Sequence, residues 1–231
     1  MKTLIIKLAA PLQSYGNEST FNRRTSYRYP SKSAVLGMIA AALGYRRNNT
    51  INITALNQLQ MAVRIDQPGE TLTDFQIIEY DRKKQKRSLS YRDYLQDAVF
   101  VVAISGENNQ IDQIDDALHH PIFQLFLGRR ANVPAGPLIT KLFDNQDPIT
   151  VLKNYEWQAA AWFQHRLKKA NYFTEIIADS KLASSNVKMM IRDEIGSFDQ
   201  NHRWHSYRSI TNIPVTLKNK NYKEHDIMAE L

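Results

Sequence analysis

The chain has 231 residues, of which 43% are hydrophobic and 10% aromatic, and this predicts a folded protein with a sizeable core. Its 30 Lys and Arg against 23 Asp and Glu leave a formal net charge of +7, which favours a polyanionic partner. The absence of Cys excludes disulfides, thiolate metal sites and a cysteine nucleophile. No run approaches the roughly 18 apolar residues of a membrane span, so we expect a cytoplasmic protein without membrane contact.

The first half of the chain shows a regular succession of strand and helix patterns. Alternating apolar residues predict strands, a continuous apolar run predicts a buried strand, and a three-to-four residue spacing predicts helices. In chain order, the predicted elements are a strand at 3–8, a helix at 33–44, strands at 61–65 and 97–105, and a helix at 111–118.

The order of these elements fits the strand–helix–strand–strand–helix–strand pattern called split βαβ or ferredoxin-like. We therefore expect an α+β fold in which residues 1–125 form a ferredoxin-like, RNA-recognition-type βαββαβ domain. Helices are expected to cover one sheet face and leave the other free, as in RNA-recognition sheets. Short apolar runs predict an irregular, β-rich C-terminal subdomain over residues 126–231.

The segment 20–33, TFNRRTSYRYPSKS, gives the clearest indication of function. It contains no acid, interleaves cations with aromatic rings, and leads into the predicted helix at 33–44. Stackable rings, cations and the free N–H groups of a helix N-terminus suit bases and phosphates. We predict nucleic-acid contact here, although a solvated arginine-rich loop is the alternative; the residues are Arg23, Arg24, Arg28, Tyr29, Ser31, Lys32 and Ser33.

Two further basic segments are candidate RNA contacts. Residues 75–94 predict a protruding hairpin whose flanks alternate like strands and whose tip carries five cations within six positions, Arg82 and Lys83 among them. The alternative for this tip is a solvated loop. Arg129 and Arg130 follow Gly128 in a turn whose backbone could approach a ligand closely, so the pair is either a bidentate phosphate clamp or part of a structural ion pair.

Catalytic and metal-binding patterns are weak in this sequence. The histidines show no metal-ligand spacing with a nearby acid on an evident helix, and no phosphate-loop motif follows a strand, so no cofactor or metal is predicted. Metal-free RNA cleavage needs a general base and a cation, which His202 or His205 with Arg203 or Arg208 could supply. The alternative, which we favour, is that these residues bind phosphate or pack beside Trp204.

Five blocks resemble, in order, the CasD family, the Cas5-type subunits of the type I-E CRISPR surveillance complex Cascade. The resemblance spans residue 3 to about residue 210, and its first two blocks are the specific ones. The blocks are 8–16 (LAAPLQSYG), 28–37 (RYPSKSAVLG), 91–95 (YRDYL), 127–130 (LGRR) and 191–194 (IRDE).

This resemblance implies an RNA-recognition-type fold of the repeat-associated superfamily and a subunit that caps the 5′ handle of the crRNA. Residues 75–94 would be the thumb that contacts the first backbone subunit. Within the matching blocks, Gln13, Tyr15 and Arg92 join the expected RNA-binding residues. The implied partners are the crRNA, the CasC backbone, the CasA large subunit and, as a further candidate, CasE, with target DNA reached indirectly.

The resemblance also implies a binding protein rather than an enzyme. In the type I-E branch a separate endonuclease subunit cuts the RNA. In a related branch the Cas5-type protein is itself the nuclease, so a metal-independent endoribonuclease that processes repeat RNA is the alternative function.

Overall fold

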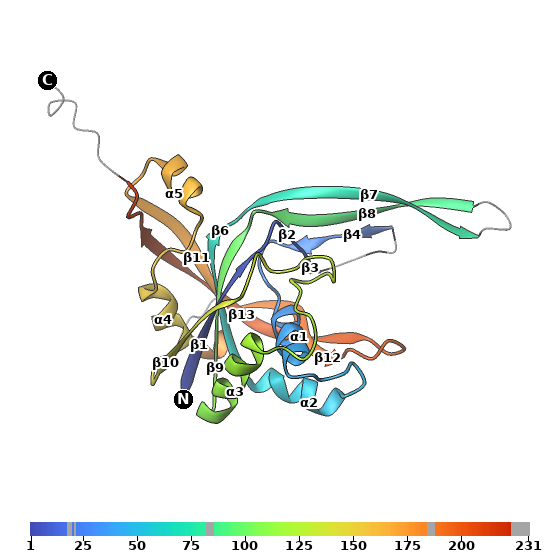
Figure 1. Ribbon diagram of the computed structural model, residues 1–231, viewed down its shortest axis with the longest axis horizontal. Coiled ribbons are helices and arrows are strands. Elements are labelled where there is room, and N and C mark those ends of the chain that lie inside the picture. The colour runs from blue at the N-terminus through green and yellow to red at the C-terminus, as the bar shows by residue number, and fades with distance from the viewer. Residues whose placement is uncertain (18–19, 21, 82–85, 184–187, 223–231) are drawn as a thin grey trace, which may run out of the picture.

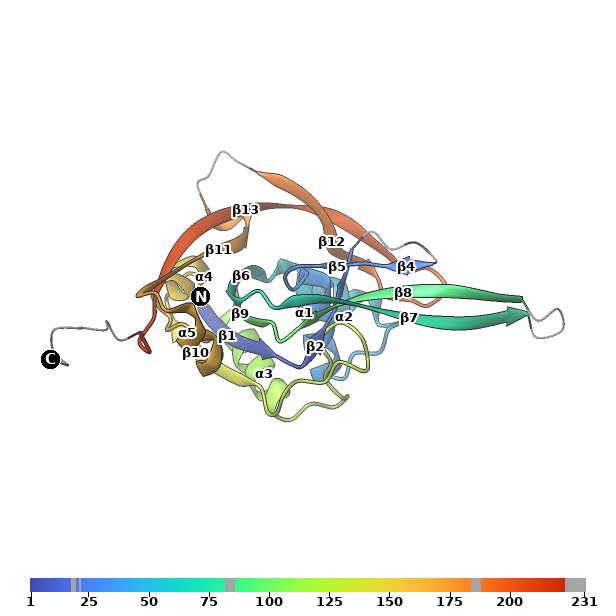
Figure 2. The same ribbon diagram turned by 90° about the horizontal axis from the view of Figure 1, so that it is seen from above.

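The computed structural model describes residues 1–17, 20, 22–81, 86–183 and 188–222. They form a mixed α+β fold on a curved seven-stranded sheet, from which a long hairpin projects (Figures 1 and 2). All neighbouring strands of this sheet are antiparallel. In order across the sheet they are β10 (Ile139–Asp144), β1 (Lys2–Ala9), β9 (Val99–Gly106), β6 (Gln60–Gln67), β11 (Asn171–Asp179), β13 (Trp204–Lys218) and β12 (Met189–Ser197).

The elements predicted for the first half of the chain are present, with shifts of a few residues at their ends. The helices are α1 (Lys32–Ala42) and α3 (Asn108–His119), and the predicted spacing of Ile111, Ile114 and Leu118 does place these residues in the core. Along the chain the order is β1, α1, β6, β9, α3, β10, and the four strands lie in the order β10-β1-β9-β6. A short helix, α2 (Thr50–Ala55), and a 3-10 turn (Leu56–Gln58) precede β6.

Both faces of the sheet are covered, which corrects the expectation of a free face. On β1, Leu4 and Ile6 pack into the large core with α1 and α3, whereas Ile5 points to the opposite face. There α4 (Pro148–Asn154) buries Leu152 in a second core. A strand covered on both faces needs apolar residues at consecutive positions, which is why β9 is buried almost throughout.

The second half of the chain extends the same sheet. It adds β11, β12 and β13, together with α5 (Ala161–Leu167) and a 3-10 turn (Ser180–Leu182). The sheet runs without a break across residue 125, because β10 pairs with β1 and β11 pairs with β6. The division of the chain into two domains stays a prediction.

A fully buried ion pair fixes the segment between α4 and α5 to the sheet. Arg64 of β6 donates to both carboxylate oxygens of Asp66, at 2.7 and 2.8 Å. The same guanidinium donates to the main-chain oxygens of Leu152, Tyr155 and Glu156. Because a buried charge is costly unless paired and fully hydrogen-bonded, this arrangement determines where α4 leaves the sheet.

The hairpin consists of β7 (Glu70–Asp81) and β8 (Lys86–Gln96) and is longer than the predicted range 75–94. On its other edge β8 pairs with two short strands, β2 (Leu12–Gln13) and β4 (Arg23–Arg24), and β3 (Tyr15–Gly16) pairs with β5 (Ser26–Tyr27) beside them. Both views show the distal half projecting beyond the rest of the molecule. The predicted tip residues Arg82 and Lys83 lie outside the described residues.

Candidate nucleic-acid interface

The basic segment lies along the root of the hairpin. Its strand β4 pairs in parallel with β8, so that Arg23 lies opposite Tyr91 and Arg24 opposite Arg92. The main-chain N–H of Tyr91 donates to the oxygen of Asn22 at 2.7 Å. Hydrogen bonding thus brings together two basic stretches that are almost 70 positions apart in the sequence.

Three arginines form a cluster at this root: Arg24, Arg92 and Arg129, hereafter the arginine cluster. The guanidinium of Arg129 lies 4.4 Å from the ring centre of Tyr94 and donates to the main-chain oxygen of Arg24 at 3.2 Å. Tyr94 follows Arg92 by two positions, so both belong to the same face of β8. The cluster combines cations with an aromatic ring on one surface.

The positive charge of the arginine cluster is not compensated within the described part of the chain. None of its three guanidinium groups takes part in an ion pair there. Moreover, Nε of Arg92 and Nη1 of Arg129 are buried N–H groups without an acceptor among the described residues. Such groups are rare in native proteins and indicate a missing anionic or polar partner.

The turn that carries Arg129 and Arg130 is held against the segment at Ser14. Gly128 has a φ of +88°, and a Cβ at this position would overlap the carbonyl oxygen of Ser14. The N–H of Ser14 donates to the oxygen of Leu127 at 3.2 Å. The backbone of Gly128 therefore approaches the protein's own chain at Ser14 and not a ligand. This contact places Arg129 at the arginine cluster, while Arg130 stays exposed.

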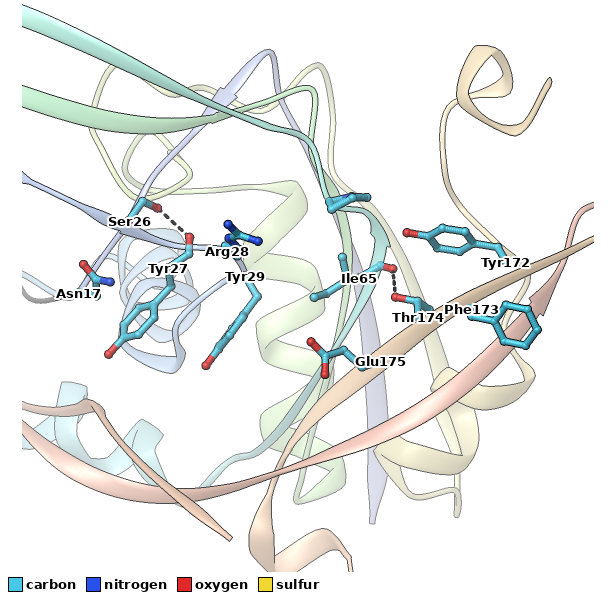
Figure 3. Close-up of a pocket in the computed structure, with 11 residues that line it drawn as sticks. Asn17, Ser26, Tyr27, Arg28, Tyr29, Ile65, Tyr172, Phe173, Thr174 and Glu175 are labelled. Atoms are coloured by element: carbon cyan, nitrogen blue, oxygen red, sulfur yellow. Dashed lines mark hydrogen bonds between the residues drawn. The ribbon is translucent and has the colours of Figure 1, made fainter. Parts of the chain in front are cut away.

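A cleft of about 770 Å³ opens beside the basic segment (Figure 3). On one wall the rings of Tyr27 and Tyr29 are stacked, with centres 5.7 Å apart and planes at 25°, and exposed Arg28 lies between them in sequence. Mainly because of burial, the pKa of Tyr29 is raised to about 12, so its hydroxyl stays protonated. The opposite wall is residues 172–175 of β11, from which Glu175 extends toward Tyr29.

Aromatic faces, a cation and a carboxylate around one cleft suit a nucleobase and its phosphate. The rings offer stacking surface, Arg28 offers charge, and Glu175 offers an acceptor for base amino groups. One oxygen of Glu175 also accepts from the Asn212 side chain at 2.9 Å, which holds the carboxylate in place. Sequence reasoning missed this second wall, because residues 172–178 were identified only as a short apolar run.

Gln13 and Tyr15 have structural positions instead of the expected RNA contacts. Both side chains are buried, with 0% and 1% exposure. The Tyr15 hydroxyl donates to Gln13 Oε1 at 2.6 Å, and Gln13 Nε2 donates to the oxygen of Ala98 at 2.7 Å. Burial raises the pKa of Tyr15. We therefore revise their role to the support of the loop after β1.

The N-terminus of α1 is already occupied by a protein carboxylate, which corrects the expectation of a phosphate at Ser31, Lys32 and Ser33. The main-chain N–H of Lys32 donates to Asp193 at 2.8 Å, and Ser31 and Ser33 are buried. The Lys32 side chain is also internal and lies 3.0 Å from Asp179. A phosphate here would meet the negative charge of Asp193.

Arg208 completes this buried network rather than facing RNA. It donates to both oxygens of Asp193, at 2.6 and 2.9 Å, and to Asp179 at 2.5 Å. Burial by itself would lower the pKa of Arg208, but the two carboxylates raise it overall. Lys32, Arg208, Asp179 and Asp193 are hereafter the buried network, which joins α1 to β11, β12 and β13.

Neither histidine considered for RNA cleavage is oriented as a general base by an acid within the described structure. His202 is exposed, whereas His205 is half-buried with its ring centre 6.0 Å from that of Phe198. Burial and the charge of Arg203 lower the pKa of His205. Arg208 is bound to its two aspartates, and within the described ranges neither imidazole has a hydrogen bond to an acid.

No group of three or more His, Asp or Glu side chains among the described residues is placed to hold a metal ion. No helix in this part of the chain is long and apolar enough to cross a membrane.

Comparison with known proteins places these features in a family. The model of the family described as CRISPR-associated protein (Cas_Cas5) matches residues 3–211, which is most of the chain. The chain belongs to the Cas5 family. The matched range spans the arginine cluster, both walls of the cleft and the buried network.

Individual proteins and structures agree with the family match. The chain is 30% identical over 171 residues to a protein of Escherichia coli strain K12 named CRISPR system Cascade subunit CasD, covering 66% of this chain and 76% of that protein. A chain of a solved CRISPR RNA-guided surveillance complex superposes with a TM-score of 0.75 at 29% identity, with 97% of this chain and 95% of that chain covered. A crystal structure titled Cas protein gives a TM-score of 0.66 at 25% identity, over 96% and 98% of the two chains.

Proposed function

We propose that this Cas5 chain is the CasD-type subunit of a type I-E CRISPR Cascade surveillance complex. In this role it is a non-catalytic RNA-binding protein of antiviral defence that caps the 5′ handle of the crRNA in the cytoplasm. Support comes from the curated relative, which is named as a Cascade subunit, and from the surveillance-complex chain, which matches nearly the whole of this one.

The arginine cluster is the observation that carries the RNA-binding part of the proposal. Arg24, Arg92 and Arg129 converge without acidic partners in the described structure, and two of them contain buried N–H groups without acceptors. Phosphate oxygens would supply those acceptors and neutralise the charge. Exposed Arg23 and Arg130 flank the cluster, so a strand of phosphates could continue on either side.

The cleft beside the cluster would receive the bases of the same strand. Single-stranded RNA is recognised mainly by stacking on aromatic rings and by hydrogen bonds to base edges. Tyr27 and Tyr29 offer the ring faces, and Arg28 offers a charge for the adjoining phosphate. The handle would thus lie along the basic segment, between the hairpin root and β11.

We propose further roles for the elements of the fold. The sheet β10-β1-β9-β6 with α1 and α3 would be the ferredoxin-like RNA-recognition domain, with its fourth strand beyond residue 125. The hairpin would be the thumb that contacts the CasC backbone, since Phe75 and Ile77 leave an exposed apolar face on it. CasA and CasE are further proposed partners, and target DNA would be reached through the assembled complex.

Co-purification tests the proposal directly. The tagged chain, expressed with the other Cascade subunits and a CRISPR array, should retain crRNA and those subunits. Arg92→Gln with Arg129→Gln should lose most of the RNA, because two charge-assisted contacts are removed without changing shape greatly. The control, Lys168→Gln with Lys169→Gln, removes the same charge from exposed positions after α5, which lies well apart from β4 (Figure 1). Equal RNA in both variants would contradict the assignment.

A further inference from the structure

The turn between β12 and β13 and the loop after α1 form a second basic surface that the proposed handle site does not include. Its members are Arg46, Arg47, Arg203 and Trp204, hereafter the turn surface. In Figure 1 β12 and α2 lie on one side of α1, whereas β4 and β8 lie on the other. The turn surface is therefore separate from the arginine cluster.

Specific contacts hold the two segments of the turn surface together. The side chain of Asn57, after α2, donates to the main-chain oxygen of Ile195 at 2.7 Å and accepts from its N–H at 3.3 Å. Phe198 at the turn packs against Gly37 of α1, where an added Cβ would lie 3.4 Å from the ring. The turn is thus fixed against the α1–α2 region rather than free in solvent.

Like charges meet on this surface. The Arg203 guanidinium lies 5.9 Å from the ring centre of Phe198, and partial burial together with the charge of Arg47 lowers the pKa of Arg203. Arg46 and Arg47 are exposed, and neither they nor Arg203 has an ion pair within the described residues. The one acid in the turn, Asp199, accepts from the N–H of Asn201 at 2.8 Å.

Trp204 adds a ring for stacking. Its indole rests directly on the backbone of Gly196, where any Cβ would overlap the ring, and Ser197 pairs with Trp204 across the strands. The side chain nevertheless remains 44% exposed. The indole is thus held against a glycine on one side and open to solvent on the other, beside arginines without ion pairs in the described structure. Such a ring can stack on a nucleobase.

We infer that the turn surface binds a stretch of single-stranded RNA, with Arg47 and Arg203 on phosphates and Trp204 under a base. Juxtaposed arginines without acids are unfavourable in the free protein and become favourable with a polyanion. The inference rests on the proposed function, because the RNA would be the crRNA whose handle lies at the arginine cluster. The turn surface would be a second binding site for the same RNA.

The test is the salt dependence of binding between the purified full chain and a fluorescent single-stranded RNA of the repeat-derived handle with several flanking nucleotides. Arg47→Ala with Arg203→Ala should flatten the log–log slope by about 1.4, at about 0.7 for each lost phosphate contact. Trp204→Ala should weaken binding by roughly 5- to 150-fold, the factor for one stacked base, and Trp204→Phe should restore most of it.

Two comparisons make the outcome decisive. Lys168→Ala with Lys169→Ala removes the same charge elsewhere and should leave the slope nearly unchanged; an equal loss in both double variants would overturn the inference. If wild type binds the RNA and the turn-surface variants bind identically, this inference alone fails. If folded wild type does not bind the RNA at all, the proposed function fails with it. Cross-linking of 4-thiouridine RNA should label a peptide that contains Trp204, which a purely structural role would not produce.

Discussion

At the scale of single residues, charged side chains in this chain separate into two groups. Lys32, Arg64 and Arg208 are buried and each contacts an aspartate, whereas Arg24, Arg92 and Arg129 have no acidic partner among the described residues. The first group stabilises the fold, because breaking a buried pair leaves an uncompensated charge. The second group is available to a ligand. Local sequence does not distinguish Lys32 from Arg24, since both occur in the basic segment 20–33.

The buried network gives a prediction about stability. Asp193→Asn should lower the free energy of unfolding by about 3–5 kcal/mol, because Arg208 and the N-terminus of α1 lose their common anion. Urea denaturation measures this change. The matched control is Asp112→Asn at the surface pair with Lys2, where little change in the free energy of unfolding is expected. Comparable changes in the two variants would show that Asp193 is not a structural centre.

At the scale of elements, α4 is a helix that the sequence analysis does not predict. Its N-cap Asp147 accepts from the N–H groups of Ile149 and Thr150, both at 3.0 Å, and Pro148 occupies the first turn. This combination is a helix-start signal, but a helix of seven residues is too short to show a clear apolar period. The helix matters because it buries the second sheet face.

The cap of α4 predicts a pH-dependent stability. Burial alone would raise the pKa of Asp147, but hydrogen bonds from Thr150 and Ile149 lower it overall. The folded-state pKa of Asp147 therefore lies below its unfolded value of about 3.9. The ionised cap stabilises the fold at pH values above about 3.9, and this stabilisation is lost as the pH falls through the folded-state pKa. Asp147→Ala should cost about 1 kcal/mol at pH 7, and the cost should shrink in acid.

An asparagine at the cap position provides the control for this prediction. Asp147→Asn keeps a capping oxygen without a titratable charge, so it should cost less than Asp147→Ala and should lack the acid-dependent loss of wild type. Thermal unfolding of the three proteins from acid to neutral pH makes the comparison. A pH-independent gap between wild type and Asp147→Ala would rule out an ionised cap.

The hairpin is the element whose removal should separate folding from assembly. Replacing residues 79–87, beyond the Ile78–Ser88 pair, by an Asn-Gly turn keeps the register of β7 and β8 and the pairing of β4 with β8. The melting temperature should change little, because the distal hairpin projects from the body (Figure 2). With Phe75→Ser and Ile77→Ser added, which removes the exposed apolar face of the hairpin, assembly with the backbone subunit should fail. Normal incorporation of the shortened protein into the complex would contradict the thumb assignment.

At the scale of the whole molecule, the sequence was informative where structure is local and silent where it is long-range. The strand β1 and the helices α1 and α3 are predicted by the spacing of apolar residues over short stretches of sequence. The carboxylate at the mouth of α1 comes from Asp193, 161 positions away, and no local pattern could anticipate it. The cleft is likewise formed by residues near 27 and 172, which only the sheet topology brings together.

The same distinction applies to catalysis, and it gives the last prediction. Cleavage through the 2′-hydroxyl needs a base held in place and a cation beside it, and loss of a general base typically costs about 10²- to 10⁴-fold in rate. In the described structure Arg208 is taken by Asp179 and Asp193, and neither His202 nor His205 is oriented by an acid. Wild-type protein incubated with repeat RNA in EDTA should therefore yield no discrete product. His202→Ala with His205→Ala should still load crRNA. Cleavage at one phosphodiester by wild type, abolished in this double variant, would make the chain the processing nuclease instead.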